Sequence, residues 1–220
     1  MSEPKGEEIV KLLSTGADDD DLANELLKSI WAGYPVENVS RLLHARSDEA
    51  VKAGAWVLSE LGADATSMLF EVDFLLRHSV RHARFFALDV ALVCATEQHG
   101  ELIARAISLV GDEDGAVRWK ALRFLGRAGA AQLAAGAVAL EDVRLRELVE
   151  WLAVPAGGIG SQQDVVQRLD DQDDLVRLFA VAAASREAGN SLGLVLAADS
   201  TDPDVAGFAR DELQSRQRDG

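Results

Sequence analysis

The sequence has few of the residues that support redox chemistry or a bulky aromatic core. Only 5% of its 220 residues are aromatic, whereas 48% are hydrophobic, mostly Ala, Leu and Val, which suit closely packed helices. The single cysteine, Cys94, cannot form an internal disulfide and lies between the apolar Val93 and Ala95. We therefore expect a buried, inert thiol and no redox chemistry.

Long apolar segments and catalytic motifs are also missing. No run of eighteen apolar residues is present, and the first residues, MSEPKGEEIVKL, lack the apolar stretch of a secretory signal, so we expect a cytoplasmic protein that does not enter a membrane. The chain has no P-loop, dinucleotide-binding glycine motif, HExxH, CxxC or GxSxG. These absences predict a protein that is not an enzyme, with no catalytic residue and no cofactor.

Two histidines have a spacing that occurs in metal sites. His78 and His82 are four residues apart, which would place both on one face of a helix. The neighbouring Arg77, Arg81 and Arg84 would repel a cation, so we predict no metal site. The acidic runs at 18–21 and 170–174 are expected to cap helices in solvated turns and not to act in proton transfer.

Acidic residues outnumber basic ones, 37 to 22, and the net charge is −15. The excess is concentrated in residues 1–73 and 128–220, with formal balances of −9 and −8, whereas residues 74–127 carry +2. A field of this sign repels nucleic acid and favours basic protein partners. The expected partner is therefore a basic protein, and nucleic acid is not expected.

Residues 112–129, DEDGAVRWKALRFLGRAG, are the clearest of a series of related segments. Val117, Ala121 and Leu125 fall on one face of a helix. Weaker copies recur 26 to 34 residues apart, a period typical of stacked helical repeats. The anchor pairs of the copies are Leu22/Leu26, Val51/Ala55, Ala83/Ala87, Val117/Ala121, Val143/Glu147, Val176/Ala180 and Val205/Ala209.

Turn-forming residues separate the copies. An aspartate that can cap a helix stands three residues before four of the anchors, at Asp48, Asp114, Asp173 and Asp202. Gly129 is expected to end a helix in the left-handed conformation. Shorter amphipathic stretches give each copy a partner helix, so we predict an all-α fold of about seven helix pairs. We expect one domain over 1–220, with residues 155–161, PAGGIGS, as the candidate kink.

Two copies share a pattern of an aspartate, a Val-Arg pair and a small residue: Asp114, Val117-Arg118, Ala121 and Leu125, and Asp173, Val176-Arg177 and Ala180. This pattern resembles the HEAT and HEAT-like repeats of α-solenoid proteins. The resemblance implies a right-handed solenoid of antiparallel helix pairs, with the second helix of each pair on the concave side. It implies no particular ligand, because this fold serves many roles.

The resemblance also implies a ladder of ion pairs, in which the basic residue after each anchor pairs with the aspartate of a neighbouring copy. The basic positions are Lys52, Arg84, Arg118, Arg144 and Arg177. The third copy has Val80 in place of the aspartate, and the last has Ala206 in place of the basic residue. We expect the ladder to fail in those two copies.

The third and fourth copies carry a concentration of basic residues, namely Arg77, Arg81, Arg84, Arg118, Lys120, Arg123 and Arg127. Because neighbouring copies of a solenoid are adjacent, these side chains would form a positive patch suited to a carboxylate-rich segment or a phosphate. The other interpretation is that they pair with acids of adjacent copies. The sequence favours this second interpretation, since the acidic excess supplies many partners.

Aromatic residues suggest a second candidate surface. Trp56, Phe85 and Trp119 lie beside the core stripe of successive copies, where they either line the concave wall or fill the core. Tryptophan and arginine are the residues that most often anchor interfaces. The candidate partner-binding residues are therefore Trp56, Arg81, Arg84, Trp119, Lys120, Arg123 and Arg127.

These observations support two hypotheses about function. The first is a non-enzymatic scaffold that recognises a basic protein, and one specific form of it is an immunity or inhibitor protein for a nuclease-type toxin. The second is a HEAT-like enzyme or ligand-modifying factor, lyase-like or related to nucleic acids, that binds an anionic group through the basic patch. The net charge of −15 disfavours a DNA-binding role of the kind found in solenoid glycosylases.

Overall fold

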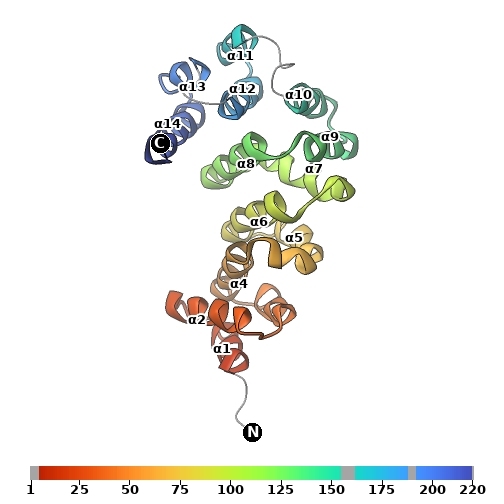
Figure 1. Ribbon diagram of the computed structural model, residues 1–220, viewed down its shortest axis with the longest axis vertical. Helices are drawn as coiled ribbons and strands as arrows, with labels where there is room; N and C mark the ends of the chain where they lie inside the picture. The colour runs from red at the N-terminus through yellow and green to blue at the C-terminus, as the bar shows by residue number, and fades with distance from the viewer. Residues whose placement is uncertain (1–4, 155–161, 188–191, 220) are drawn as a thin grey trace. The chain divides into compact units, whose positions relative to one another are not determined.

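A computed structural model of the chain describes residues 5–154, 162–187 and 192–219, and every regular element in these ranges is a helix. The all-α prediction is therefore confirmed. The chain divides into two compact units, Met1–Ala95 and Thr96–Gly220. The single domain remains a prediction, and the candidate kink at 155–161 lies outside the described residues (Figure 1).

The first unit is built from six α-helices and two short 3-10 helices among its described residues. In chain order these are α1 (Lys5–Ser14), α2 (Asp20–Trp31), η1 (Val36–Val39), α3 (Ser40–Leu43), α4 (Asp48–Glu60), η2 (Gly62–Met68), α5 (Leu69–Leu75) and α6 (Arg81–Cys94). α4 lies between α2 and α6 and packs against both (Figure 1). Of their predicted anchors, Leu26, Val51, Ala55, Ala83 and Ala87 are buried, as the helical period requires, whereas Leu22 is only half-buried.

The second unit contains eight α-helices and two 3-10 helices in the part of the chain that is described. They are η3 (Glu97–His99), α7 (Gly100–Ser108), η4 (Leu109–Gly111), α8 (Gly115–Arg127), α9 (Ala130–Ala139), α10 (Val143–Ala153), α11 (Gln162–Leu169), α12 (Asp174–Arg186), α13 (Leu192–Ala197) and α14 (Pro203–Asp219).

Helix α8 of this unit packs against helices that follow it much later in the chain. It contacts α12 and α14, whereas α10, the second helix of the intervening copy, packs against α9 and α12. A simple copy-by-copy order would place α10 beside α8. The fifth copy is thus displaced from the group of mutually contacting helices that α8, α12 and α14 form.

The sequence register predicted for the fifth copy was wrong. Val143, its expected anchor, is 59% exposed, while Leu145 and Val149 are buried. Asp142 caps α10 by accepting a hydrogen bond from the Leu145 backbone N–H at 3.0 Å. The register therefore shifts by two residues, and Arg146, not Arg144, occupies the basic position of this copy.

The predicted caps are mostly confirmed. Asp114 and Asp173 cap α8 and α12 with their carboxylates, and Asp202 accepts from the first turn of α14. Asp48 is an exception, because Ser47 is the residue that precedes α4 and Asp48 is already helical.

The predicted left-handed stop at Gly129 is also wrong. Its φ is −65°, and it precedes α9, where its N–H donates to Gln132 Oε1 at 2.7 Å. Helix α8 ends at Arg127 with Ala128 as its C-cap, so Gly129 belongs to the start of the next helix and needs no positive φ.

Arginines at the basic position close the turn that precedes their own helix. In each case the guanidinium donates to a backbone carbonyl six residues earlier: Arg84 to His78, Arg118 to Asp112, Arg146 to Leu140 and Arg177 to Asp171. Such charge-assisted bonds satisfy carbonyls at the end of the preceding helix or turn. The basic position thus has a local structural role that is independent of any ladder.

Candidate functional site

The ladder implied by the HEAT resemblance exists in part. Lys52 pairs with Asp18 of the preceding copy, and Arg177 pairs with Asp202 of the following copy. Arg144, which stands two residues before the basic position of its copy, pairs with Asp173. The third copy has Arg84 on the backbone carbonyls of His78 and Ser79, in line with the missing aspartate. These contacts join basic side chains of the helices to turns and helix caps of the same protein.

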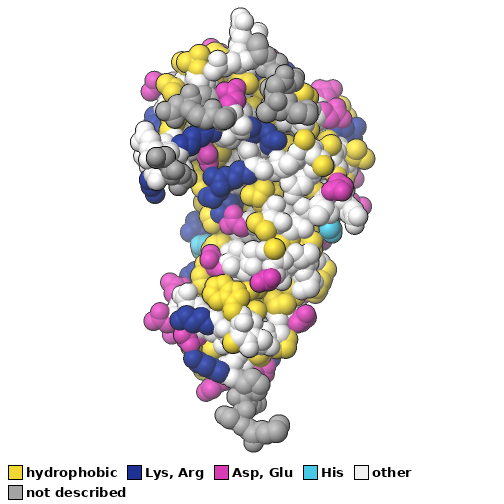
Figure 2. Space-filling view, in the orientation of Figure 1, with side chains coloured by type: hydrophobic (Ala, Val, Ile, Leu, Met, Phe, Trp, Pro, Cys, Tyr) yellow, Lys and Arg dark blue, Asp and Glu magenta, His cyan; other side chains and the backbone are white. Residues whose placement is uncertain are grey.

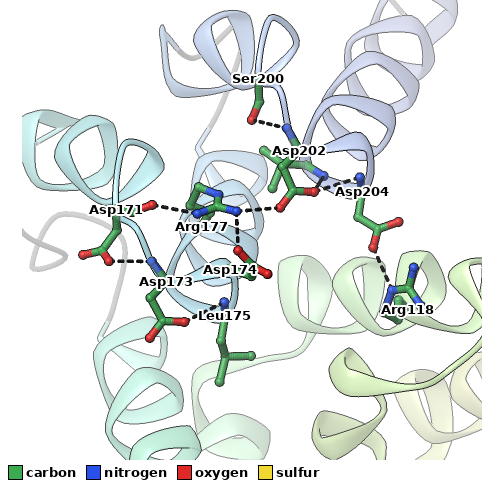
Figure 3. A network of polar contacts seen from close by, with 10 residues as sticks. Arg118, Asp171, Asp173, Asp174, Leu175, Arg177, Ser200, Asp202 and Asp204 are labelled. Atoms are coloured by element: carbon green, nitrogen blue, oxygen red, sulfur yellow. Dashed lines mark hydrogen bonds and ion pairs between the residues drawn. The ribbon is translucent and has the colours of Figure 1, made fainter.

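Arg118 connects two helices that are far apart in the sequence. Its Nε lies 2.7 Å from Asp204 Oδ2, 86 residues away at the start of α14 (Figure 3). This hydrogen bond, assisted by the nearby charge of the carboxylate, raises the pKa of Arg118 above its already high ordinary value. Arg177 reaches Asp202 in the same network at 3.1 Å (Figure 3). The N-terminus of α14 is therefore fixed to α8 and α12.

The candidate binding residues of α8 also face α14. The Trp119 ring meets the ring of buried Phe208 with centroids 6.2 Å apart, and Arg127 lies 3.7 Å from Glu212. Lys120 is only 7% exposed. The structure thus places Trp119 and Arg127 in the packing between α8 and α14, and it buries Lys120.

Arg123 and Lys120 both lie near the ring of Trp119. The Arg123 guanidinium carbon lies 5.8 Å from the Trp119 ring centroid, and Lys120 Nζ lies 5.9 Å from the same point, which are cation–π distances. The Trp119 indole Nε1 is buried and has no hydrogen-bond partner among the described residues. In Figure 2, basic side chains gather over the region of α8, α12 and α14.

The basic residues of the third copy are placed in the first unit. Arg84 is 7% exposed and held by its carbonyl bonds, Arg77 pairs with Asp73, and Arg81 is exposed at the first position of α6. The predicted patch draws its residues from both units. Its formation as one patch remains a prediction, while the contacts within each unit favour the internal-pairing interpretation.

A second group of residues surrounds a pocket of about 310 Å³ in the first unit. We call it the Trp56 pocket. It is lined by Ala17, Asp18, Asp19, Asp20, Ala23, Asn24, Glu49, Lys52, Ala53, Trp56 and Phe86. Its walls come from the start of α2, one face of α4 and one residue of α6. The hydrophobic group over α4 and the acidic side chains near α2 are visible in Figure 2.

Helical periodicity places the α4 residues of this pocket together. Glu49, Lys52, Ala53 and Trp56 follow one another at steps of three, one and three residues, so they share a face of the helix. The alanines at 17, 23 and 53 occupy positions where a larger side chain would fill the hollow. The pocket results from small residues beside a large aromatic one.

The charge of the Trp56 pocket is strongly unbalanced. Four of its lining residues are acidic and one is basic. Lys52 Nζ lies 3.1 Å from Asp18 Oδ1 and 3.4 Å from Glu49 Oε2, and its hydrogen bond holds the pKa of Asp18 below the ordinary value. Asp19 is used as a cap, since its Oδ1 accepts from the N–H groups of Asp21 and Leu22. The pocket already holds one ammonium group of the chain itself.

The sequence pointed to only part of this site. The sequence pattern predicts Trp56 as a binding residue and aligns it with Phe85, whereas Phe86 is the residue that lines the pocket. Phe85 packs edge to face against Phe86 with centroids 5.3 Å apart. The run of aspartates at 18–21 was assigned to capping, which describes Asp19 but not the pocket wall. The surrounding alanines were the available signal, because small residues beside an aromatic leave space.

A wider hollow of about 850 Å³ lies at the other end of α2. Tyr34, on its wall, donates a hydrogen bond to Glu7 Oε2 at 3.0 Å, and burial together with this carboxylate raises the pKa of Tyr34 to about 12. Arg41 Nη1 binds the same carboxylate at 2.8 Å. These polar groups satisfy one another, so we assign no binding role to this hollow.

No protein-family model matches the chain. No curated protein matches it in sequence either. The functional argument therefore rests on the residues themselves.

The other residues that the sequence suggests for metal binding or reactivity, two histidines and one cysteine, are in contact with other parts of the protein. His78 accepts a hydrogen bond from the Val80 N–H at 3.1 Å, and His82 stacks on Phe86. Among the described residues, no group of three or more His, Cys, Asp and Glu side chains is arranged to hold a metal ion. Cys94 is buried, and burial raises its pKa.

Within the described ranges, no helix has both the length and the apolar character needed to cross a membrane.

Proposed function

We propose that this protein is a non-enzymatic binding scaffold of the HEAT-like α-solenoid type, which recognises a basic protein partner through its acidic surface. The observation that carries the proposal is the difference in surroundings between basic and acidic side chains. Basic side chains such as Arg84, Arg118 and Arg127 bind carbonyls and carboxylates of the chain itself. The acids of the Trp56 pocket outnumber its one basic residue, Lys52, by four to one, and they border two aromatic rings.

The overall charge supports the same proposal. A net charge of −15 speeds association with a basic protein and disfavours polyanions. The repeated aspartate caps and turn-closing arginines support the solenoid architecture as the scaffold. In its most specific form, the protein is a cytoplasmic immunity or inhibitor protein that covers a nuclease-type toxin.

Isothermal titration against the product of the adjacent gene tests this proposal. We expect association that weakens about ten-fold between 50 and 500 mM NaCl, because salt screens the charges that attract the partners. Inhibition of a nuclease activity of that partner would support the immunity form. An absence of association, or binding that is indifferent to salt, would contradict recognition of a basic partner.

One observation favours the alternative, an anion-binding enzyme or ligand-modifying factor. Arg123 and Lys120 lie over Trp119, whose buried Nε1 lacks a described partner. An anion at this place would accept from the indole and the guanidinium together. Titration with inorganic phosphate and with a nucleotide, in the unchanged protein and in Arg81→Ala and Arg123→Ala variants, tests it. Binding that survives both substitutions, or no binding, removes its basis.

A further inference from the structure

The Trp56 pocket combines three features. It is concave, it has aromatic side chains from two helices, and four of its five charged lining residues are acidic. A run of acids on a surface is ordinarily a solvated face, but here the acids border a hollow walled by Trp56 and Phe86. The hollow is therefore the feature to be explained.

The lining selects for a cation that also has a flat or apolar part. An anion would be repelled by the carboxylates, and a purely apolar group would remove them from water without compensation. A cationic side chain gains from the faces of the aromatic rings and from the carboxylates at once. At about 310 Å³ the pocket is at the lower end of the size of small-ligand pockets, which suits a single side chain.

Lys52 shows how the carboxylates use a cation. Its Nζ lies within 3.4 Å of both Asp18 and Glu49, and its side chain is 32% exposed. Asp18 and Glu49 remain 64% and 44% exposed, so each has oxygen atoms open to a further donor. An arriving cation would share these oxygens with Lys52 or displace it toward solvent.

We propose that the Trp56 pocket receives one arginine side chain of the protein partner, with the guanidinium against Trp56 and Phe86 and its N–H groups on Asp18 and Glu49. This inference rests on the proposed function, since it names the group by which the partner is held. Arginine fits better than lysine, because the planar guanidinium stacks on aromatic rings, binds carboxylates in a bidentate way and is less strongly hydrated.

The test uses three short peptides that differ only in one side chain, which is arginine, lysine or the neutral isostere citrulline. Each is titrated into the full chain labelled with ¹⁵N, and the indole N–H signal of Trp56 is followed, with assignment from a Trp56→Leu variant. We expect a saturable shift with the arginine peptide. Binding should be about ten-fold weaker with citrulline, which lacks the charge, and measurably weaker with lysine.

Two substitutions test the pocket and its internal cation. Ala53→Leu fills the hollow and should abolish the Trp56 shift, and Lys52→Met keeps the aliphatic stem but removes the competing charge, so it should tighten arginine binding several-fold. Circular dichroism and the melting temperature of each variant establish that it is folded. Trp31→Leu is the matched control, because Trp31 ends the same helix α2, is 61% exposed and does not line the pocket.

Equal shifts with arginine and citrulline, or arginine binding that persists in folded Ala53→Leu protein, would overturn the inference. The two proposals fail separately. If the salt-dependent partner binds Ala53→Leu protein unchanged, the acidic scaffold stands and the arginine pocket does not. If the peptide binds at Trp56 but no basic protein partner associates, the pocket stands and the proposed function does not.

Discussion

Glu71 is one of four charged or polar residues that are buried in the described part of the chain. Its side chain is 5% exposed, and its Oε2 lies 2.9 Å from Nε2 of His44, which is 52% exposed. His44 also packs on Phe74, with ring centroids 4.6 Å apart. The histidine therefore connects a buried carboxylate with the surface of the first unit.

Removing this histidine should destabilise the protein because the buried Glu71 carboxylate would lose its hydrogen-bond partner. We expect His44→Ala to lower the free energy of unfolding by about 1–3 kcal/mol, the usual cost of depriving a buried polar group of its partner. Urea denaturation measures the loss, with Arg46→Ala, an exposed neighbour, as the control. If Glu71→Leu does not reduce the effect of His44→Ala in a double-mutant cycle, the bond is not its cause.

At the scale of the helices, Arg186 of α12 binds the C-terminal end of α8. Its Nη1 donates to the carbonyls of Leu125 and Ala128 at 2.9 and 2.8 Å, and burial lowers the pKa of this arginine from its ordinary value. The last carbonyls of a helix have no partner within the helix, and a cation there also opposes the negative end of the helix dipole. The contact between α8 and α12 is therefore directional as well as apolar.

Alanine substitutions at two glycines distinguish the effect of close helix packing from the effect of helix propensity. A Cβ at Gly136 of α9 would lie 2.6 Å from Ile103 Cγ2 and 2.7 Å from Ile107 Cδ1 of α7, while nothing lies within 4 Å of such an atom at Gly207 of α14. Gly136→Ala should therefore destabilise by about 1–3 kcal/mol through overpacking. Gly207→Ala should stabilise by up to about 1 kcal/mol.

Denaturant midpoints of the two single variants decide this prediction. Similar effects of both substitutions would mean that α7 and α9 do not approach as closely as described.

The limits of sequence-based prediction are clearest in how helices pair. Local chemistry was sufficient for the caps Asp114 and Asp173 and for most anchors, because each depends on residues within one or two turns. The contact of α8 with α12 depends on residues about sixty positions apart, and no local pattern encodes it. The Trp56 pocket was missed for the same reason, since Phe86 is thirty residues from Trp56 and the alanines between the helices carry no motif.

Carboxylates that pair with Lys and Arg side chains make the stability of the protein dependent on pH. Hydrogen bonds from Lys5 and Lys28 lower the pKa of Glu25 to about 2 from 4.5, and Arg41 and Lys52 lower the pKa values of Glu7 and Asp18. A carboxylate whose pKa is lowered by folding adds stability above its unfolded pKa, and this contribution is lost as protons bind. We expect stability to fall as the pH drops from about 4.5 toward 2.

Urea midpoints across this range measure the effect, and Lys28→Met provides the comparison. With one of its two ammonium partners removed, Glu25 should have a less depressed pKa, so the variant should lose less stability between pH 4.5 and 2. An identical acid profile for both proteins would show that the Glu25 cluster does not contribute.

The bond between Arg118 and Asp204 also has a consequence for folding during synthesis on the ribosome, because its two residues are made at different times. Translation adds roughly 5–20 residues per second, and the two residues are 86 positions apart, so α8 is made roughly 4 to 17 seconds before its partner in α14. Until α12 and α14 have been synthesised, the face of α8 that carries Trp119 lacks the helices against which it packs. A nascent chain halted before α14 would present this surface to chaperones.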